Sequence, residues 1–174
     1  MDKTEILKEK LAEAEVVLIG IGEEFNEKFD RIAEHEQLVK GLELVDAKEE
    51  LAWMVPYFEK IYLQEQNQSD ILSAYRNLYE LVKDKNYYIV TTCIDGLIQK
   101  AGFKPEKIVE PCGNYEKMQC SAKCSTKLYE SEEYANKIKE ALQDGTLEQV
   151  EQPVCPDCGA PLAFNNIVCE NYVE

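Results

Sequence analysis

The chain has 174 residues, of which 45% are hydrophobic and 30% charged, a balance typical of a folded globular protein. Its 34 acidic and 19 basic residues give a formal net charge of −15, which disfavours nucleic acid and anionic membrane surfaces as partners because like charges repel. No apolar run approaches the roughly 20 residues that span a bilayer, and the N-terminus lacks the apolar stretch of a signal peptide, which favours a cytoplasmic protein.

The N-terminal part of the chain predicts a helix, a strand and a glycine turn. Residues 4–14 have apolar positions at helical spacing. The continuous apolar run over residues 16–19 is closed by Gly20-Ile-Gly22, a pattern typical of a strand buried on both faces of a parallel sheet. Acidic residues then favour the start of a helix that continues towards Ile32.

Helical and strand patterns alternate through the rest of the chain. A helix is predicted over residues 47–65, with Pro56 as a kink, and another begins after Ser69, which can cap it. Residues 87–92 (Tyr-Tyr-Ile-Val-Thr-Thr) are the clearest strand. Shorter elements are predicted over residues 95–101 (helix), 107–110 (strand) and 132–143 (helix).

The order of these elements predicts an α/β fold, with a partial parallel, Rossmann-like sheet flanked by helices. After Pro111 the composition changes, and cysteine, glycine, asparagine and serine become frequent. We therefore expect an α/β domain over residues 1–110 and a zinc-binding module over residues 111–174.

Two closely spaced cysteine pairs predict a structural zinc site. Zinc binds four thiolates in a tetrahedron, and two pairs on tight turns supply such a set. The second pair, in the sequence Cys-Pro-Asp-Cys-Gly, has the turn residues of a zinc knuckle. A redox role needs only one pair, and in a reducing compartment seven cysteines are better explained as metal ligands or free thiols. The predicted ligands are Cys120, Cys124, Cys155 and Cys158.

The turn at Gly20 and Gly22, between a predicted strand and a predicted helix, has the geometry that places a pyrophosphate on helix N-terminal amides. A single Gly-x-Gly is also common where an α/β turn needs glycine for packing alone. Glu23 and Glu24 oppose phosphate binding, since two unit charges about 4 Å apart repel by roughly 1 kcal/mol in water and by more in a dry pocket. A carboxylate here could itself occupy the anion site.

Four blocks of the sequence, taken in order, resemble the sirtuins, a family of NAD-dependent deacylases and ADP-ribosyltransferases. Residues 14–22 are similar to the family's opening strand and Gly-Ala-Gly turn, and residues 88–102 to its T-x-N-x-D-x-L-H-x-x-A-G block. Residues 109–114 lie where the family has its His-Gly motif, and the two cysteine pairs follow. The sequence "LVKDKNYYIVTT" is most similar to the microbial macrodomain-linked branch.

The resemblance implies that residues 1–110 are a partial NAD-binding-type domain and that the four cysteines hold structural zinc. It implies that the residues lining the NAD site are Gly20, Gly22, Thr91 and Asp95. Cys112 stands where the family has its general base, a histidine, and a thiol without a neighbouring imidazole is a poor base. Cys93 replaces the asparagine that contacts the nicotinamide ribose. His35, the only histidine, is interpreted as a solvated residue on a polar helix face.

The sequence also ends at Glu174, about where the family has its V-x-F-G-E segment. We therefore expect a C-terminally truncated sirtuin fold that lacks the second half of the nucleotide-binding sheet. Either the strand with Ile19 or the strand with Ile89 and Val90 would then be an exposed edge. Unpaired edges favour association, which predicts a homo-oligomer or a complex with another protein.

Three functions stay open at this point. The favoured hypothesis is a catalytically degenerate pseudoenzyme that binds NAD, ADP-ribose or a protein partner. The alternative is an active NAD-dependent deacylase or ADP-ribosyltransferase with Cys112 at the base position, where the macrodomain-linked branch looks relaxed. A third possibility is a zinc-ribbon scaffold. Cys93 and Cys112 could form a redox-sensing or metal-binding thiol pair, although two small apolar replacements explain them more simply, and Cys169 is interpreted as a free thiol.

Overall fold

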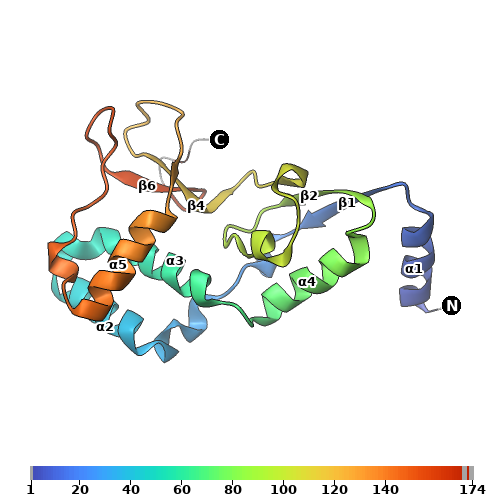
Figure 1. Cartoon of the computed structure of the whole chain (residues 1–174), viewed down its shortest axis with the longest axis horizontal. Helices are drawn as coiled ribbons and strands as arrows, with labels where there is room; N and C mark the ends of the chain where they lie inside the picture. Colours follow the sequence, from blue (N-terminus) through green and yellow to red (C-terminus); the bar gives the residue numbers. More distant parts are fainter. Residues whose placement is uncertain (1, 170–171, 173–174) are drawn as a thin grey trace.

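A three-stranded parallel sheet lies in one half of the molecule and an antiparallel sheet in the other (Figure 1). The computed structural model describes residues 2–169 and 172. The parallel sheet has the strand order β1-β2-β3, and its strands are β1 (Val16–Ile21), β2 (Asn86–Thr91) and β3 (Ile108–Val109). The predicted α/β fold with a parallel sheet is therefore confirmed.

One face of the parallel sheet is apolar and exposed, which contradicts the expectation that β1 is buried on both faces. Val16 and Leu18 are 56% and 75% exposed, and Tyr88 and Val90 on β2 are 46% and 41% exposed. Ile89, which points to the opposite face, is fully buried in the core beneath α4 (Asp70–Val82). The expectation is wrong because, among the described residues, α4 covers one face of the sheet only, and the other face is exposed on the central strand β2 as well as on β1.

Local sequence explains where the helices begin. The predicted cap of α4 is confirmed, since Ser69 Oγ accepts a hydrogen bond from the Leu72 N–H at 3.1 Å. Pro56 lies in the first turn of α3 (Val55–Glu65), where a backbone N–H would have no acceptor within the helix, so proline costs no hydrogen bond there. The predicted kink at Pro56 within a longer helix is therefore wrong. A 3₁₀ helix, Glu49–Met54, precedes it. The other α-helices are α1 (Lys3–Glu13), α2 (Glu36–Ala47) and α5 (Glu132–Asp144).

The helix predicted from Glu23 towards Ile32 is wrong. Two short 3₁₀ helices, Glu23–Phe25 and Phe29–Glu34, take its place, and the backbone of Asn26 between them is extended. The chain leaves the helical path because Asn26 and Glu27 hydrogen-bond to the segment that follows β2. The expected strand-turn-helix geometry for pyrophosphate is therefore not formed by this segment.

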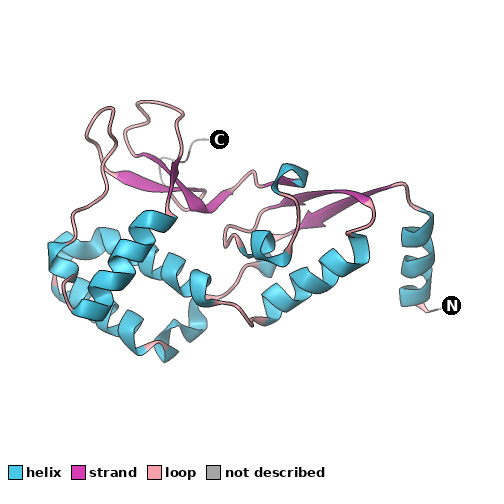
Figure 2. Ribbon diagram, in the orientation of Figure 1, coloured by secondary structure: helices cyan, strands magenta, loops and turns pink. Residues whose placement is uncertain are grey.

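The antiparallel sheet has the order β5-β4-β6 and carries the cysteine-rich loops (Figure 2). Its strands are β4 (Gly113–Cys120), β5 (Tyr129–Glu130) and β6 (Leu162–Asn166). Three 3₁₀ helices complete the described elements: Leu97–Ala101, Pro105–Lys107 and Leu147–Gln149.

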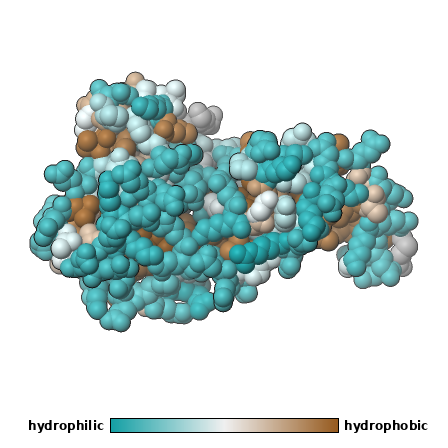
Figure 3. All heavy atoms as spheres, in the orientation of Figure 1, coloured by the Kyte–Doolittle hydropathy of each residue, from teal (hydrophilic) through white to brown (hydrophobic). Residues whose placement is uncertain are grey.

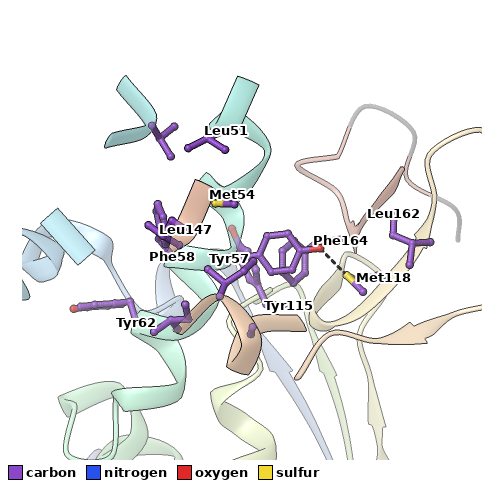
Figure 4. Close-up of a cluster of buried hydrophobic side chains, with 14 of the residues drawn as sticks. Leu51, Met54, Tyr57, Phe58, Tyr62, Tyr115, Met118, Leu147, Leu162 and Phe164 are labelled. Atoms are coloured by element: carbon purple, nitrogen blue, oxygen red, sulfur yellow. Dashed lines mark hydrogen bonds between the residues drawn. The ribbon is translucent and has the colours of Figure 1, made fainter. Parts of the chain in front are cut away.

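Two hydrophobic clusters divide the core. One, shown in Figure 4, joins helices α2, α3 and α5 to β4 and β6, with Phe58, Met118 and Phe164 among its members. The other joins α4 to the parallel sheet around Leu72 and Ile89. We call these parts the ribbon half and the sheet half. Because α2 and α3 precede residue 110 yet pack with the ribbon, the clusters do not follow the predicted boundary at that residue, and the division into two domains stays a prediction.

Lys100 connects the two halves. Its ammonium donates hydrogen bonds to the carbonyl oxygens of Leu63 and Gln64, both at 2.9 Å, at the C-terminal end of α3. A cation is favoured at this position because the C-terminal carbonyls of a helix carry partial negative charge.

The face of the molecule in Figure 3 is largely hydrophilic, with apolar patches at the ribbon loops and beside α1. α1 itself buries no residue and leaves Leu7 63% exposed. Among the described residues, no helix combines the length and apolarity needed to cross a membrane.

Candidate metal centre and nucleotide site

The four predicted zinc ligands lie together at the tip of the antiparallel sheet. Cys120 ends β4, Cys124 follows in the next turn, and Cys155 and Cys158 lie in the loop before β6. Their sulfur atoms all lie within 4.8 Å of one another, with 3.4 Å between Cys120 and Cys158 and 3.5 Å between Cys124 and Cys155. Zinc–sulfur bonds of about 2.3 Å in a tetrahedron place sulfurs about 3.8 Å apart. The four thiols therefore form a set that could hold zinc.

Backbone conformation brings these cysteines together. Gly159 has a φ of +75° and Lys123 a φ of +51°, so both turns pass through the left-handed region. The Gly159 N–H donates to the Cys155 carbonyl at 2.8 Å, and the Cys155 N–H donates to the Ala160 carbonyl at 2.7 Å. The turn that follows from the Cys-Pro-Asp-Cys-Gly sequence is thus closed by its own backbone.

Tyr129 on β5 contacts the metal centre from outside the ligand set, with its hydroxyl 3.7 Å from the Cys155 sulfur. A hydroxyl that donates to a metal-bound thiolate orients the ligand, and losing such a contact typically weakens metal binding 10–100-fold. Tyr129→Phe is therefore expected to speed zinc release to a chromophoric chelator about 10-fold. Tyr134→Phe, on α5, is the control, and equal release rates for the two variants would contradict this role.

The residues expected to line a nucleotide site lie at the carboxyl ends of β1 and β2. Gly20 is in β1 opposite Val90, and Thr91, at the end of β2, pairs with Ile21 and is fully buried. Gly22 follows β1, and a Cβ placed there would lie 3.2 Å from Oε2 of Glu24, so this carboxylate lies directly beside the turn. Glu24 is thus positioned to oppose phosphate binding at this turn, as its place in the sequence predicts.

Asp95 holds the two loops together. Its Oδ2 accepts a hydrogen bond from the Glu27 N–H at 2.7 Å and its Oδ1 accepts one from the Leu97 N–H at 2.9 Å. The neighbouring Ile94 N–H donates to Oδ1 of Asn26 at 2.8 Å. Asn26 and Glu27 are residues of this site that the sequence pattern does not identify, because only the fold brings them to Asp95.

Three buried polar atoms around this site have no hydrogen-bond partner among the described residues: the Tyr75 hydroxyl, Glu27 Oε2 and Glu110 Oε1. Tyr75 is fully buried and lies close enough to Asp95 for the carboxylate charge to raise the pKa of its hydroxyl. Buried polar groups are normally paired, so each unpaired atom marks a place where a polar ligand would gain a hydrogen bond. Within the described residues, this polar lining could pair with hydroxyl or cationic groups of a ligand, whereas its carboxylates would repel a phosphate.

Burial raises the pKa of Asp95 from 3.8 to about 6, and the nearby charges of Glu27 and Glu110 act in the same direction, while the two backbone hydrogen bonds oppose them. Burial also raises the pKa of Glu110. The negative charges of Asp95, Glu27 and Glu110 therefore repel one another when all three carboxylates are ionised. This repulsion favours a bound proton or a cationic ligand group beside Asp95.

The raised pKa predicts a specific pH dependence of stability. The folded state binds the Asp95 proton more tightly than the unfolded chain, so the contribution of Asp95 to the free energy of unfolding falls as pH rises from about 4 to about 7, by at most about 3 kcal/mol. The difference between wild type and Asp95→Asn, measured by urea unfolding at each pH, is expected to fall accordingly. Asp84→Asn, in an exposed turn, is the control, and a flat difference for Asp95→Asn would refute the assignment.

The cysteines outside the zinc cluster occupy distinct positions. Cys93 is 2% exposed, and its thiol donates to the Gly22 carbonyl at 3.2 Å. Cys112 is half-buried in the turn before β4, and its carbonyl accepts a hydrogen bond from the Ile167 N–H. His35 lies elsewhere, with Nδ1 3.4 Å from the Glu65 carboxylate and its ring against Tyr62, so it is half-buried and not simply solvated. A Cys93–Cys112 thiol pair stays a prediction.

The sequence matches the model of the Sir2 family over residues 23–169. The chain belongs to the Sir2 family. The resemblance of the four sequence blocks to the sirtuins is therefore confirmed.

Three known proteins are similar to this chain. A protein ADP-ribosyltransferase of Staphylococcus aureus (strain Mu50 / ATCC 700699) is 26% identical over 181 residues, covering 94% of this chain. A mutant Sir2 homologue in complex with 2'-O-acetyl ADP-ribose superposes with a TM-score of 0.60 at 15% identity, covering 100% of this chain and 66% of its own. A second, in complex with ADP-ribose, has a TM-score of 0.58 at 16% identity, covering 96% and 63%. At these identities the solved structures show the Sir2 fold alone.

The chain spans about half the length of the curated relative it matches, since the alignment covers 56% of that protein.

Proposed function

We propose that this Sir2-family protein binds NAD or ADP-ribose at the carboxyl ends of β1 and β2 and turns it over poorly, in the cytoplasm, with zinc held by the four cysteines as a structural ion. The unpaired buried carboxylate oxygens of Glu27 and Glu110 beside Asp95 carry this proposal, because they offer acceptors to ribose hydroxyls or to a cationic nicotinamide ring. The Tyr75 hydroxyl lies in the same place, close to the side chains of Cys93 and Thr91. The S. aureus relative and the solved homologues with ADP-ribose ligands support the ligand class.

The proposed cofactor-binding residues have separate roles. Gly20 offers space, since a Cβ there would contact nothing within 4 Å. Gly22 keeps the turn open beside Glu24, and Thr91 holds the loop after β2, its Oγ1 accepting a hydrogen bond from the Cys93 N–H at 3.1 Å. Asp95 holds segment 22–27 in place through the hydrogen bond from the Glu27 N–H. A ligand that enters the site must therefore either contact this segment as it stands or displace it.

We propose weak turnover because a cysteine, Cys112, stands at the position of the family's general base. Bound NAD would supply an ADP-ribosyl group: the glycosidic bond to the cationic nicotinamide ring breaks, and nicotinamide leaves as a neutral molecule. The proposed catalytic position holds Cys112, a thiol, and the single imidazole of the chain pairs with Glu65. A thiol without an imidazole partner is a poor acceptor for a hydroxyl proton.

Calorimetric titration of zinc-loaded protein with NAD, and separately with ADP-ribose, tests the proposal. Micromolar binding of either ligand is expected, and Asp95→Ala is expected to weaken it at least 10-fold, while Asp84→Ala leaves it unchanged. The absence of heat with millimolar concentrations of both ligands would refute the nucleotide site.

The second candidate is an active ADP-ribosyltransferase or deacylase, which the name of the S. aureus relative favours. It predicts nicotinamide release from NAD at a rate that depends on Cys112. Release by wild type that Cys112→Ala abolishes would replace the degenerate assignment with the active one.

We also infer that the open face of the parallel sheet is a surface for association, with a second copy or another protein. The unpaired edge of β1 and the exposed side chains of Val16, Leu18 and Tyr88 support this inference. Sedimentation at micromolar concentration is expected to show a dimer or larger species, and Leu18→Lys to reduce it. A monomer at all concentrations would count against self-association.

A further inference from the structure

A pocket of about 280 Å³ lies in the ribbon half, away from the β1 and β2 loops. One wall comes from Trp53 and the start of α3, and the other from Tyr115 on β4 and Phe164 on β6. Val168 and Cys169, after β6, also line it. None of the predicted nucleotide-site residues and none of the four clustered cysteines lines this pocket.

Aromatic rings dominate the lining. Trp53 and Tyr57 meet edge to face with centroids 5.7 Å apart, Tyr57 and Phe164 lie 4.9 Å apart, and Tyr115 and Phe164 lie 5.1 Å apart. Figure 4 shows the rings of Tyr57, Tyr115 and Phe164 gathered where α3 meets the ribbon strands. The Tyr57 hydroxyl is directed to the Met118 sulfur at 3.1 Å, which fixes this ring in the wall.

Among the described residues that line the pocket, Glu59 is the one acidic side chain, and none is a lysine, arginine or histidine. Oε2 of Glu59 accepts a hydrogen bond from the Tyr115 hydroxyl at 2.7 Å. Among the described residues, no basic side chain forms an ion pair with Glu59, although ten such pairs involve other residues. The pocket therefore combines the partly exposed ring of Trp53 and the small exposed parts of three core rings, 3–5% exposed, with one carboxylate that has no basic ion-pair partner among the described residues.

The charge decides between classes of ligand. A neutral apolar group entering the pocket would remove water from the Glu59 carboxylate and give nothing in return, which is costly. A primary ammonium would lose its own strong hydration for few acceptors. A methylated ammonium is weakly hydrated, is attracted to aromatic rings and offsets the carboxylate charge. We propose that this pocket binds a methylated ammonium group on an aliphatic stem, as in a trimethyllysine side chain of a peptide.

Trp53 makes the pocket directly observable, because it is the only tryptophan in the chain. Its fluorescence is to be followed while zinc-loaded protein is titrated with three short peptides that lack tryptophan. They carry trimethyllysine, its neutral tert-butyl isostere of the same shape, or unmodified lysine. The trimethyllysine peptide is expected to saturate the signal at submillimolar concentration, and the other two to bind at least 10-fold more weakly.

The matched variants isolate the charge. Glu59→Gln keeps an acceptor for Tyr115 and removes the negative charge, so it is expected to abolish most of the preference for trimethyllysine over the isostere. Glu50→Gln makes the same change on an exposed residue outside the pocket and is expected to keep the preference.

Equal binding of trimethyllysine and its isostere, tighter binding of unmodified lysine, or no fluorescence change with any peptide at 10 mM would each overturn the proposal. The peptide comparison uses the unaltered protein, so it decides the matter even if a variant fails to fold.

Discussion

Purified protein is expected to contain one zinc ion per chain, and Cys155→Ser is expected to unfold the ribbon half. The four sulfurs lie within 4.8 Å of one another, and Cys155 is 1% exposed at the edge of the ribbon core. Structural zinc sites of this type contribute about 10–16 kcal/mol of apparent binding free energy, which is coupled to folding. Elemental analysis gives the stoichiometry, and thermal melts followed by circular dichroism, with and without a chelator, give the loss of structure.

Cys169→Ser is the control for the zinc experiment, because Cys169 lies outside the cluster. It is expected to keep both the zinc content and the melting temperature of the wild type. A chelator that removes zinc without lowering the melting temperature would show that the ribbon folds without the ion.

Lys60→Met is expected to lower the free energy of unfolding by about 3 kcal/mol. Lys60 on α3 is 2% exposed, and its ammonium lies 2.6 Å from the carboxylate of Glu116 on β4. Removing one partner of a buried ion pair typically costs 3–5 kcal/mol because the other charge is left unpaired, and the 31% exposure of the Glu116 side chain places this case at the lower end. Urea unfolding of the single variant measures the loss.

The double variant Lys60→Met, Glu116→Leu separates the lost pair from lost packing. Since apolar pairs often replace buried ion pairs without cost, the double variant is expected to recover most of the stability. If it is no more stable than Lys60→Met, the loss comes from packing and the unpaired charge is not its cause.

Short-range signals predict much of this fold. The apolar run and the paired cysteines each depend on neighbours in sequence, so β2, the cap at Ser69 and the zinc quartet could all be predicted. The failures depend on contacts between distant residues. The segment after Gly22 has acidic residues suited to a helix, but its Asn26 side chain accepts a hydrogen bond from Ile94, 68 residues away, and the helix does not form.

The candidate nucleotide site shows the same limit. Gly20, Gly22, Thr91 and Asp95 can be proposed from a resemblance, whereas Tyr75 and Glu27 carry no motif and meet Asp95 only through the packing of α4 and the loop after β1. The exposure of β1 could not be read from its composition, because an apolar strand looks the same whether helices cover one face of its sheet or both.

The lysine that reaches from the sheet half to the end of α3 has a consequence for motion. The chain crosses between the halves three times: between β1 and the 3₁₀ helix Phe29–Glu34, at residues 66–69, and between β3 and β4. These crossings alone already restrict rotation of one half against the other. Rotation must first break both hydrogen bonds of the Lys100 ammonium, one to each of two carbonyl oxygens. We therefore expect a single rotational correlation time for the whole molecule on the nanosecond scale, and relative movement of the halves only on the slower scale of collective motions.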